Sequence, residues 1–168
     1  MNWKNANIKV CRALANHERV CGYRMGVNKF LVTVDGCYAY IFPMKQIHFN
    51  KDEVKIISVP LIKNLNDYLD GIDIQPTDLC LDTHSSLIRR FKGPNHALWI
   101  KEEYLRHFEG TRYCQDRTVD HDKLPISPVL ILEVDHPVGL VLPMRVLDSR
   151  TLKEVEECDE CGIYPANG

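Results

Sequence analysis

Apolar residues near the start of the chain recur at the spacing of a helix. Five of them fall within an arc of about 100° on a helical wheel, namely Trp3, Ala6, Val10, Ala13 and Leu14. The opposite side carries polar and basic residues together with Ile8: Lys4, Asn5, Lys9, Arg12 and Asn16. This pattern predicts a helix over residues 3–16 with one face in the core and one basic, amide-rich face in water.

Two β-rich runs follow, and they flank the dipeptide Asp35-Gly36. The runs are Lys29-Phe-Leu-Val-Thr-Val34 and Cys37-Tyr-Ala-Tyr-Ile-Phe42, and Pro43 closes the second. Because glycine adopts a positive φ at little cost, Asp-Gly between two such runs predicts a β-hairpin.

The rest of the pattern mixes short strands with short helices. The runs of β-forming residues predict strands over residues 54–59, 78–82, 86–91, 128–134 and 138–142. Helical spacing predicts helices over residues 61–69 and 101–108, the second one following the apolar run 97–100. We expect residues 78–82 to pair with 86–91, Asp135-His136-Pro137 to join the last two strands, and the polar residues 111–127 to form a loop.

A helix followed by strands occurs twice, near residues 3–42 and 100–146, although no repeat is visible by residue identity. The length of 168 residues, of which 45% are hydrophobic, fits one domain around one core. We therefore predict an α+β fold in which residues 1–148 form a single domain. Residues 149–168 carry a net charge of −3 and are expected to form an acidic C-terminal tail.

The charge is uneven along the chain. The net charge is −2 overall, which argues against a generic nucleic-acid coat, but residues 1–50 carry +5. That basic third could attract phosphate or an acidic partner, or it could be an ordinary solvated surface. No apolar run approaches the ~20 residues of a membrane span and the first residues lack a signal-peptide pattern, so we expect a cytoplasmic protein without a membrane partner.

Cysteine and carboxylate patterns give little indication of catalysis. Cys158-x-x-Cys161 has the spacing of half a zinc site or of a redox pair, and the alternative is a surface tail with two incidental thiols. Asp67, Asp70 and Asp73 lie in Asx-rich surroundings typical of a solvated turn. Phosphate-cradling glycine motifs and nucleophile elbows are absent from the sequence, so we predict no catalytic residue, cofactor or metal site.

Four segments resemble the bacterial DNA sliding clamp, the beta subunit of DNA polymerase III. Val32-Thr-Val-Asp-Gly-Cys-Tyr-Ala39 is similar to the family's Thr-Asp-Gly-His-Arg-Leu-Ala motif, and Val141-Leu-Pro-Met-Arg-Val146 to the Val-Met-Pro-Met-Arg-Leu ending of clamp chains. Leu98-Trp-Ile-Lys-Glu-Glu-Tyr-Leu105 and Ser127-Pro-Val-Leu-Ile131 resemble the clamp's Tyr-Leu helix and its Ser-Pro-Val strand. The order of the four segments is the specific part of the resemblance.

The resemblance implies one clamp-like domain, with two helices laid on antiparallel sheets built from two similar half-units. A clamp ring needs several such domains, so a chain of this length is not a ring-forming protomer by itself. Clamp helices present basic faces to duplex phosphates, and the first helix here does so with Lys4, Lys9 and Arg12. The second helix carries Glu102 and Glu103 and is expected not to.

The resemblance also implies an apolar pocket that captures a short peptide of a partner protein. The matching positions are Asp35, Gly36, Leu142, Pro143, Met144 and Arg145. Met144 would be an adaptable lining and Arg145 a ligand for a peptide carbonyl or carboxylate. In the family the two motifs belong to neighbouring domains, so here we expect them to meet across a head-to-tail homo-oligomer or to serve the fold.

These observations favour a non-enzymatic binding module with a clamp-like fold, associated with duplex DNA or with a replication protein. A second hypothesis is a small metal- or thiol-dependent enzyme that uses the region of Cys158 and Cys161. A third is a structural subunit of a larger assembly, which would dock through an apolar edge strand around Val138–Val146.

Overall fold

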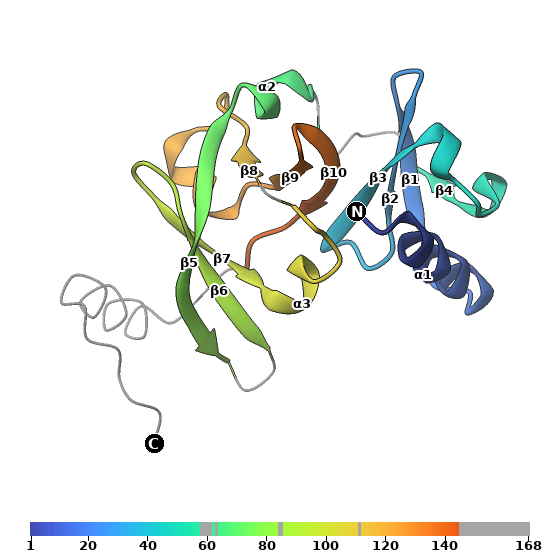
Figure 1. The fold of residues 1–168 in the computed structure, drawn as a ribbon, viewed down its shortest axis with the longest axis horizontal. Coiled ribbons are helices and arrows are strands. Elements are labelled where there is room, and N and C mark those ends of the chain that lie inside the picture. Colours follow the sequence, from blue (N-terminus) through green and yellow to red (C-terminus); the bar gives the residue numbers. More distant parts are fainter. Residues whose placement is uncertain (58–61, 63, 84–85, 111, 145–168) are drawn as a thin grey trace.

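The amphipathic N-terminal segment forms the helix that its apolar stripe predicts. The computed structural model describes residues 1–57, 62, 64–83, 86–110 and 112–144 (Figure 1). Helix α1 spans Trp3–Ala15, and the side chain of Asn2 caps it by accepting a hydrogen bond from the backbone N–H of Asn5 at 3.1 Å. Its buried residues are Ala6, Asn7, Val10 and Ala13, so the predicted core face is confirmed.

Ten strands, two further short α-helices and three 3-10 helices follow within the described residues. The strands are β1 (Cys21–Met25), β2 (Lys29–Thr33), β3 (Tyr38–Pro43), β4 (Lys55–Ile56), β5 (Ile72–Asp82), β6 (Leu87–Lys92), β7 (Ala97–Lys101), β8 (Arg112–Gln115), β9 (Val129–Glu133) and β10 (His136–Val141). The helices are α2 (Asn66–Leu69), α3 (Glu102–Leu105), η1 (Met44–Gln46), η2 (Lys51–Glu53) and η3 (His121–Ile126). None of the described helices has the length and apolar character needed to cross a membrane.

All ten strands join one sheet in the order β4-β1-β2-β3-β10-β9-β8-β5-β6-β7. Neighbours are antiparallel except β1 and β4, which pair in parallel. The predicted α+β class is confirmed, although the strands form one continuous sheet where separate sheets were expected. The predicted pairing of residues 78–82 with 86–91 is also confirmed, because β5 and β6 form an antiparallel ladder.

The sheet contains the predicted duplication of a helix followed by strands. Helix α1 precedes the meander β1-β2-β3, and helix α3 precedes the meander β8-β9-β10. The last strands of the two units pair with each other, with Tyr40 opposite Gly139. Strand β10 is therefore interior, flanked by β3 and β9, so the expectation of an apolar docking edge at residues 138–141 is wrong. The apolar side chains of β10 pack into the cores on the two faces of the sheet.

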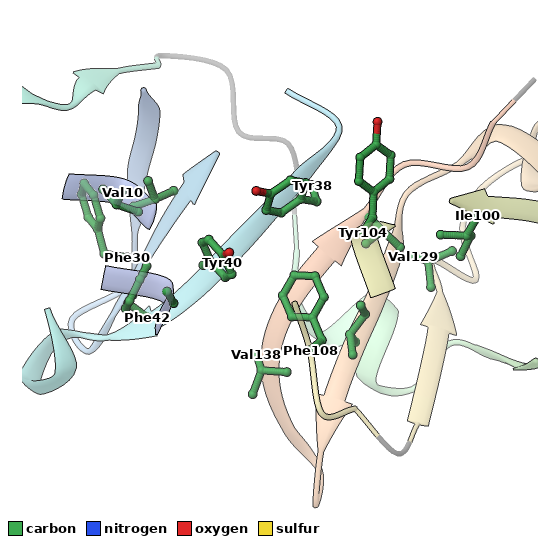
Figure 2. Packing of buried hydrophobic residues seen from close by; sticks show 14 of the residues in the cluster. Val10, Phe30, Tyr38, Tyr40, Phe42, Ile100, Tyr104, Phe108, Val129 and Val138 are labelled. Carbon is green, nitrogen blue, oxygen red and sulfur yellow. The ribbon is translucent and has the colours of Figure 1, made fainter. Parts of the chain in front are cut away.

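Alternate side chains of the central strands feed two cores, one on each face of the sheet. The helix-side core lies under α1 and α3 and includes Phe30, Tyr40, Phe42, Phe108 and Ile131. The loop-side core lies under Ile62 and residues 64–69 and includes Leu31, Ile41, Tyr68, Leu130 and Leu140. Figure 2 shows Tyr38, Tyr40 and Phe42 along β3, with α1 at one end of this row and Phe108 beside it. Both helices therefore cover the same face.

Several sequence predictions differ from the structure in extent. Residues 111–127 were expected to be a loop, but β8 runs through Arg112–Gln115 and pairs with both β5 and β9. Strand β1 was not predicted, although Cys21, Tyr23 and Met25 alternate with Gly22 and Arg24. The helices predicted over 61–69 and 101–108 shorten to α2 and α3, and the strand predicted over 54–59 is described only as β4. The predicted tail, residues 149–168, lies outside the described residues.

Candidate nucleic-acid interface

A buried asparagine fixes α1 to the segment that follows β3. The side-chain N–H₂ of Asn7 donates to the carbonyls of Trp3 and Gln46, both at 2.8 Å. Its side-chain oxygen accepts from the backbone N–H of His48 at 2.7 Å. Asn7 is only 5% exposed, and a buried amide must form hydrogen bonds within the protein; these three bonds supply partners for both its nitrogen and its oxygen. They hold the helix at a set position beside residues 46–48.

The chain that leaves α3 is held over the sheet by Phe108. This ring is 8% exposed, and its ring centroid lies 5.6 Å from that of Tyr40 on β3. It also covers Gly139 of β10, where a Cβ atom would stand 2.0 Å from the ring. The neighbouring residues Arg106 and His107 are thereby placed next to α1.

A groove of about 380 Å³ lies between α1 and residues 106–109, and we call it the inner groove. The side chains that line it are mostly polar or basic: Asn2, Asn5, Ala6, Ile8, Lys9, Arg12, Tyr40, Arg106, His107 and Glu109. Glu109 is the one carboxylate among them, and its side-chain oxygen accepts from the ammonium of Met1 at 3.1 Å. The groove therefore offers three cations and one carboxylate, and that carboxylate shares the Met1 ammonium with Glu133.

Lys9 and His107 join the two walls of the inner groove. The Lys9 Nζ lies 2.8 Å from Nε2 of His107, whose ring stacks on Tyr38 with centroids 4.6 Å apart. Burial, followed by the charge of Lys9, lowers the pKa of His107 below its usual value. The neutral imidazole can then accept a hydrogen bond from the Lys9 ammonium. Burial also lowers the pKa of Lys9, although Asp35 and Glu103 oppose that effect.

Both carboxylates of α3 form ion pairs with basic side chains. Glu102 forms an ion pair with the Nε of Arg89, and Glu103 accepts from Lys101 Nζ at 3.3 Å. The sequence predicted that the second helix would oppose phosphate because of these two acids. The structure pairs both with basic groups from β6 and β7, and it contributes Arg106 to the groove instead.

The three predicted nucleic-acid contacts share the exposed side of α1. Lys4, Lys9 and Arg12 are all exposed, Lys9 and Arg12 line the inner groove, and Lys4 and Arg12 line a second groove on the other flank of the helix. Among the residues that the structure describes, neither Lys4 nor Arg12 has a carboxylate within ion-pair distance. Unpaired cations on a rigid helix are a suitable surface for phosphate oxygens.

The residues predicted for a peptide pocket are only partly brought together. The N–H of Leu142 donates to the carbonyl of Cys37 at 2.8 Å, so the Asp-Gly turn and the Leu-Pro-Met segment meet within one chain. The expectation that they meet only across an oligomer is wrong, because β3 and β10 pair directly. Gly36 and Leu142 line a hollow of about 20 Å³, which has room for about one water molecule.

The other predicted pocket residues have local roles or lie elsewhere. Asp35 accepts from the backbone N–H groups of Cys37 and Tyr38, and Gly36 has a φ of 81°, so both shape the hairpin turn. Met144 pairs with Trp99 of β7, where its N–H donates to the Trp99 carbonyl at 2.7 Å. Pro143 precedes it outside any strand, and Arg145 lies outside the described residues. The peptide pocket stays a prediction.

The other candidate chemistry is outside this interface. Cys158 and Cys161 lie outside the described residues. In the part of the chain that the structure describes, no group of three or more His, Cys, Asp or Glu side chains is placed to hold a metal ion. Asp73 does not belong to a solvated turn: it lies in β5 and accepts from Arg112 Nε at 2.8 Å.

Sequence reasoning found the basic face of α1 but missed the residues that meet it from elsewhere in the chain. Arg106, His107, Gln46 and His48 reach α1 only through long-range packing, and no local pattern indicates them. Comparisons of this chain with protein-family models, with curated proteins and with solved structures find no match.

Proposed function

We propose that this chain is a non-enzymatic binding module with a sliding-clamp-like fold that holds the backbone of duplex DNA on the exposed face of α1. The observation that carries the proposal is the gathering of four cations around one helix that Asn7 fixes to the segment after β3: Lys4, Lys9, Arg12 and Arg106. Lys4 and Arg12 are eight residues apart, which is about 12 Å along a helix. That distance matches roughly three to four base-pair steps of a duplex.

The arrangement of the elements supports the clamp-like part of the proposal. Two units of one helix and three antiparallel strands pair through their last strands, and both helices lie on one face of the sheet. Of the segments that resemble the clamp, the Asp-Gly turn precedes β3, the last strand of the first unit, and the Leu-Pro-Met segment follows β10, the last strand of the second unit. One such domain would contact DNA from one side.

Direct binding to a labelled 20-base-pair duplex tests the proposal, with fluorescence anisotropy measured at low salt. We expect the triple variant Lys4→Gln, Lys9→Gln, Arg12→Gln to weaken binding at least tenfold, because each lost phosphate contact removes part of the counterion release. These three side chains are exposed, so the variant should keep its fold, which circular dichroism would verify.

A matched control separates position from overall charge. The variant Arg24→Gln, Lys55→Gln, Lys92→Gln removes the same number of exposed cations from β1, β4 and β6. It should bind the duplex within about twofold of the wild type, because these residues are not on α1. Equal losses in both triple variants, or no duplex binding by the wild type at low salt, would contradict the proposed function.

A further inference from the structure

The second groove on α1, between the helix and residues 46–48, has a different character from the inner groove. We call it the outer groove; its volume is about 500 Å³. Its apolar wall includes Trp3 and Ile8, its rim carries Lys4 and Arg12, and its far side is formed by Gln46 and His48. No carboxylate lines it. The size falls within the range of pockets that hold small molecules, roughly 300–1,000 Å³.

Trp3 presents an aromatic surface to this groove. One side of the indole packs against Phe42, with ring centroids 5.2 Å apart and planes tilted by 43°. The side chain is half-buried and lines the groove. Beside it Ile8 is 37% exposed and adds apolar surface to the groove. Proteins that bind single-stranded nucleic acids combine such an aromatic surface, on which bases stack, with cations that contact the phosphates.

We propose that the outer groove receives an unstacked base of single-stranded DNA, which stacks on Trp3 while Lys4 and Arg12 hold the adjacent phosphates. The amide of Gln46 and the imidazole of His48 lie at the opposite wall and can hydrogen-bond to a base edge. This inference rests on the proposed function, since Lys4 and Arg12 also belong to the duplex-binding face. It adds that the module favours DNA with an unpaired stretch beside the duplex.

An acidic peptide with one aromatic side chain would meet the same cations and the same indole. The continuity of the groove with the proposed phosphate-binding face favours the nucleic acid, because one strand could follow Arg12 from one groove to the other. Binding of such a peptide in place of the oligonucleotide would contradict the proposal.

Trp3 itself supplies the readout. The chain has two tryptophans, and Trp99 is 5% exposed, so contact quenching by an added ligand should report on Trp3. The probes are a ten-nucleotide thymidine oligomer and an abasic oligomer of the same length, which has the same phosphates and no bases. We expect the thymidine oligomer to quench Trp3 and to bind about tenfold more tightly than the abasic one.

Two variants assign that preference to the groove. Trp3→Leu should remove the tenfold preference and leave binding of the abasic oligomer unchanged. Ile8→Gln serves as a second variant, because its side chain is partly exposed and the substitution keeps a good helix former; it should reduce the preference severalfold. A preference that survives both substitutions would overturn the proposal.

The remaining outcomes are distinguishable from one another. Equal binding of both oligomers without quenching would overturn the base site and leave the phosphate contact of the proposed function intact. Failure of both oligomers and of the duplex at low salt would overturn the proposed function as well. Quenching by a glutamate-rich decapeptide containing one phenylalanine, but not by the thymidine oligomer, would show that the groove is a protein-binding site and would overturn the proposal.

Discussion

Gly139 is the position where a single methyl group should test how the second helix unit packs on the sheet. A Cβ atom at Gly139 would stand 2.0 Å from Cε1 and 2.5 Å from Cζ of Phe108. The ring cannot withdraw easily, because it is 8% exposed and lies among the rings of Tyr38 and Tyr40. The substitution Gly139→Ala therefore forces the ring, and with it residues 106–109, away from β10.

The magnitude follows from the cost of overpacking a core. An added methyl group that displaces a packed side chain costs about 1–3 kcal/mol. Urea denaturation of a domain of this size has a slope of about 2 kcal/mol/M, so the midpoint should fall by about 0.5–1.5 M with the slope unchanged. The same displacement should weaken duplex binding, because Arg106 and His107 line the inner groove.

The double-mutant cycle with Phe108→Ala decides whether the ring is the cause. Phe108→Ala alone should cost about 3–5 kcal/mol by leaving a cavity in the helix-side core. In that background Gly139→Ala should be neutral or should stabilise by up to about 1 kcal/mol, because alanine is better than glycine within a strand. Equal costs of Gly139→Ala with and without the Phe108 ring would show that the ring is not the cause.

Three further predictions concern other parts of the chain. Val134 is 75% exposed with a φ of 47° in the turn before β10, so Val134→Asn should stabilise by about 1 kcal/mol and raise the Tm by about 2–4 °C in a thermal scan; an unchanged Tm would contradict this. Burial and the charge of Lys9 lower the pKa of His107, so the folded chain resists a proton that the unfolded chain binds. The free energy of unfolding should thus fall as the pH drops below about 6.5, and guanidinium titrations at several pH values should show that His107→Gln, but not exposed His17→Gln, removes this part of the dependence. Burial and a hydrogen bond to Asp73 raise the pKa of Cys114 to about 12, so mass spectrometry after alkylation of the native protein at mildly basic pH should find Cys114 unmodified and exposed Cys11 modified.

Local sequence patterns predicted the elements that are determined by their own residues and not by distant contacts. The stripe from Trp3 to Leu14 is a sufficient signal for α1, and Asp35-Gly36 between two β-rich runs is sufficient for the hairpin. Strand β8 could not be found in this way, because its polar residue Gln115 is buried only through the pairing of β8 with β5 and β9. Gln115 is fully buried there, and its amide donates to the carbonyl of Leu124 and to Ser127. No local sequence pattern around Gln115 indicates those hydrogen-bond partners.

Some residues of the candidate site were predictable from local periodicity, and others were not. Lys4, Lys9 and Arg12 share a helix face, so periodicity alone places them together. Arg106 and His48 join them through the sheet, which brings residues about forty and a hundred positions away next to α1. Helix α3 carries no basic residue of its own, as the sequence predicted; the ion pair of Glu102 with Arg89 was not predictable, because it depends on the position of β6.

The salt dependence of duplex binding counts the phosphate contacts made by α1 and Arg106. Four phosphate contacts, from Lys4, Lys9, Arg12 and Arg106, predict that the logarithm of the association constant falls with the logarithm of salt concentration with a slope of about −3.6. Affinity should then drop about 100-fold between roughly 50 and 200 mM salt, and Arg12→Gln should flatten the slope by about 0.9. A slope near zero, or a slope that Arg12→Gln leaves unchanged, would contradict a DNA backbone held on the face of α1.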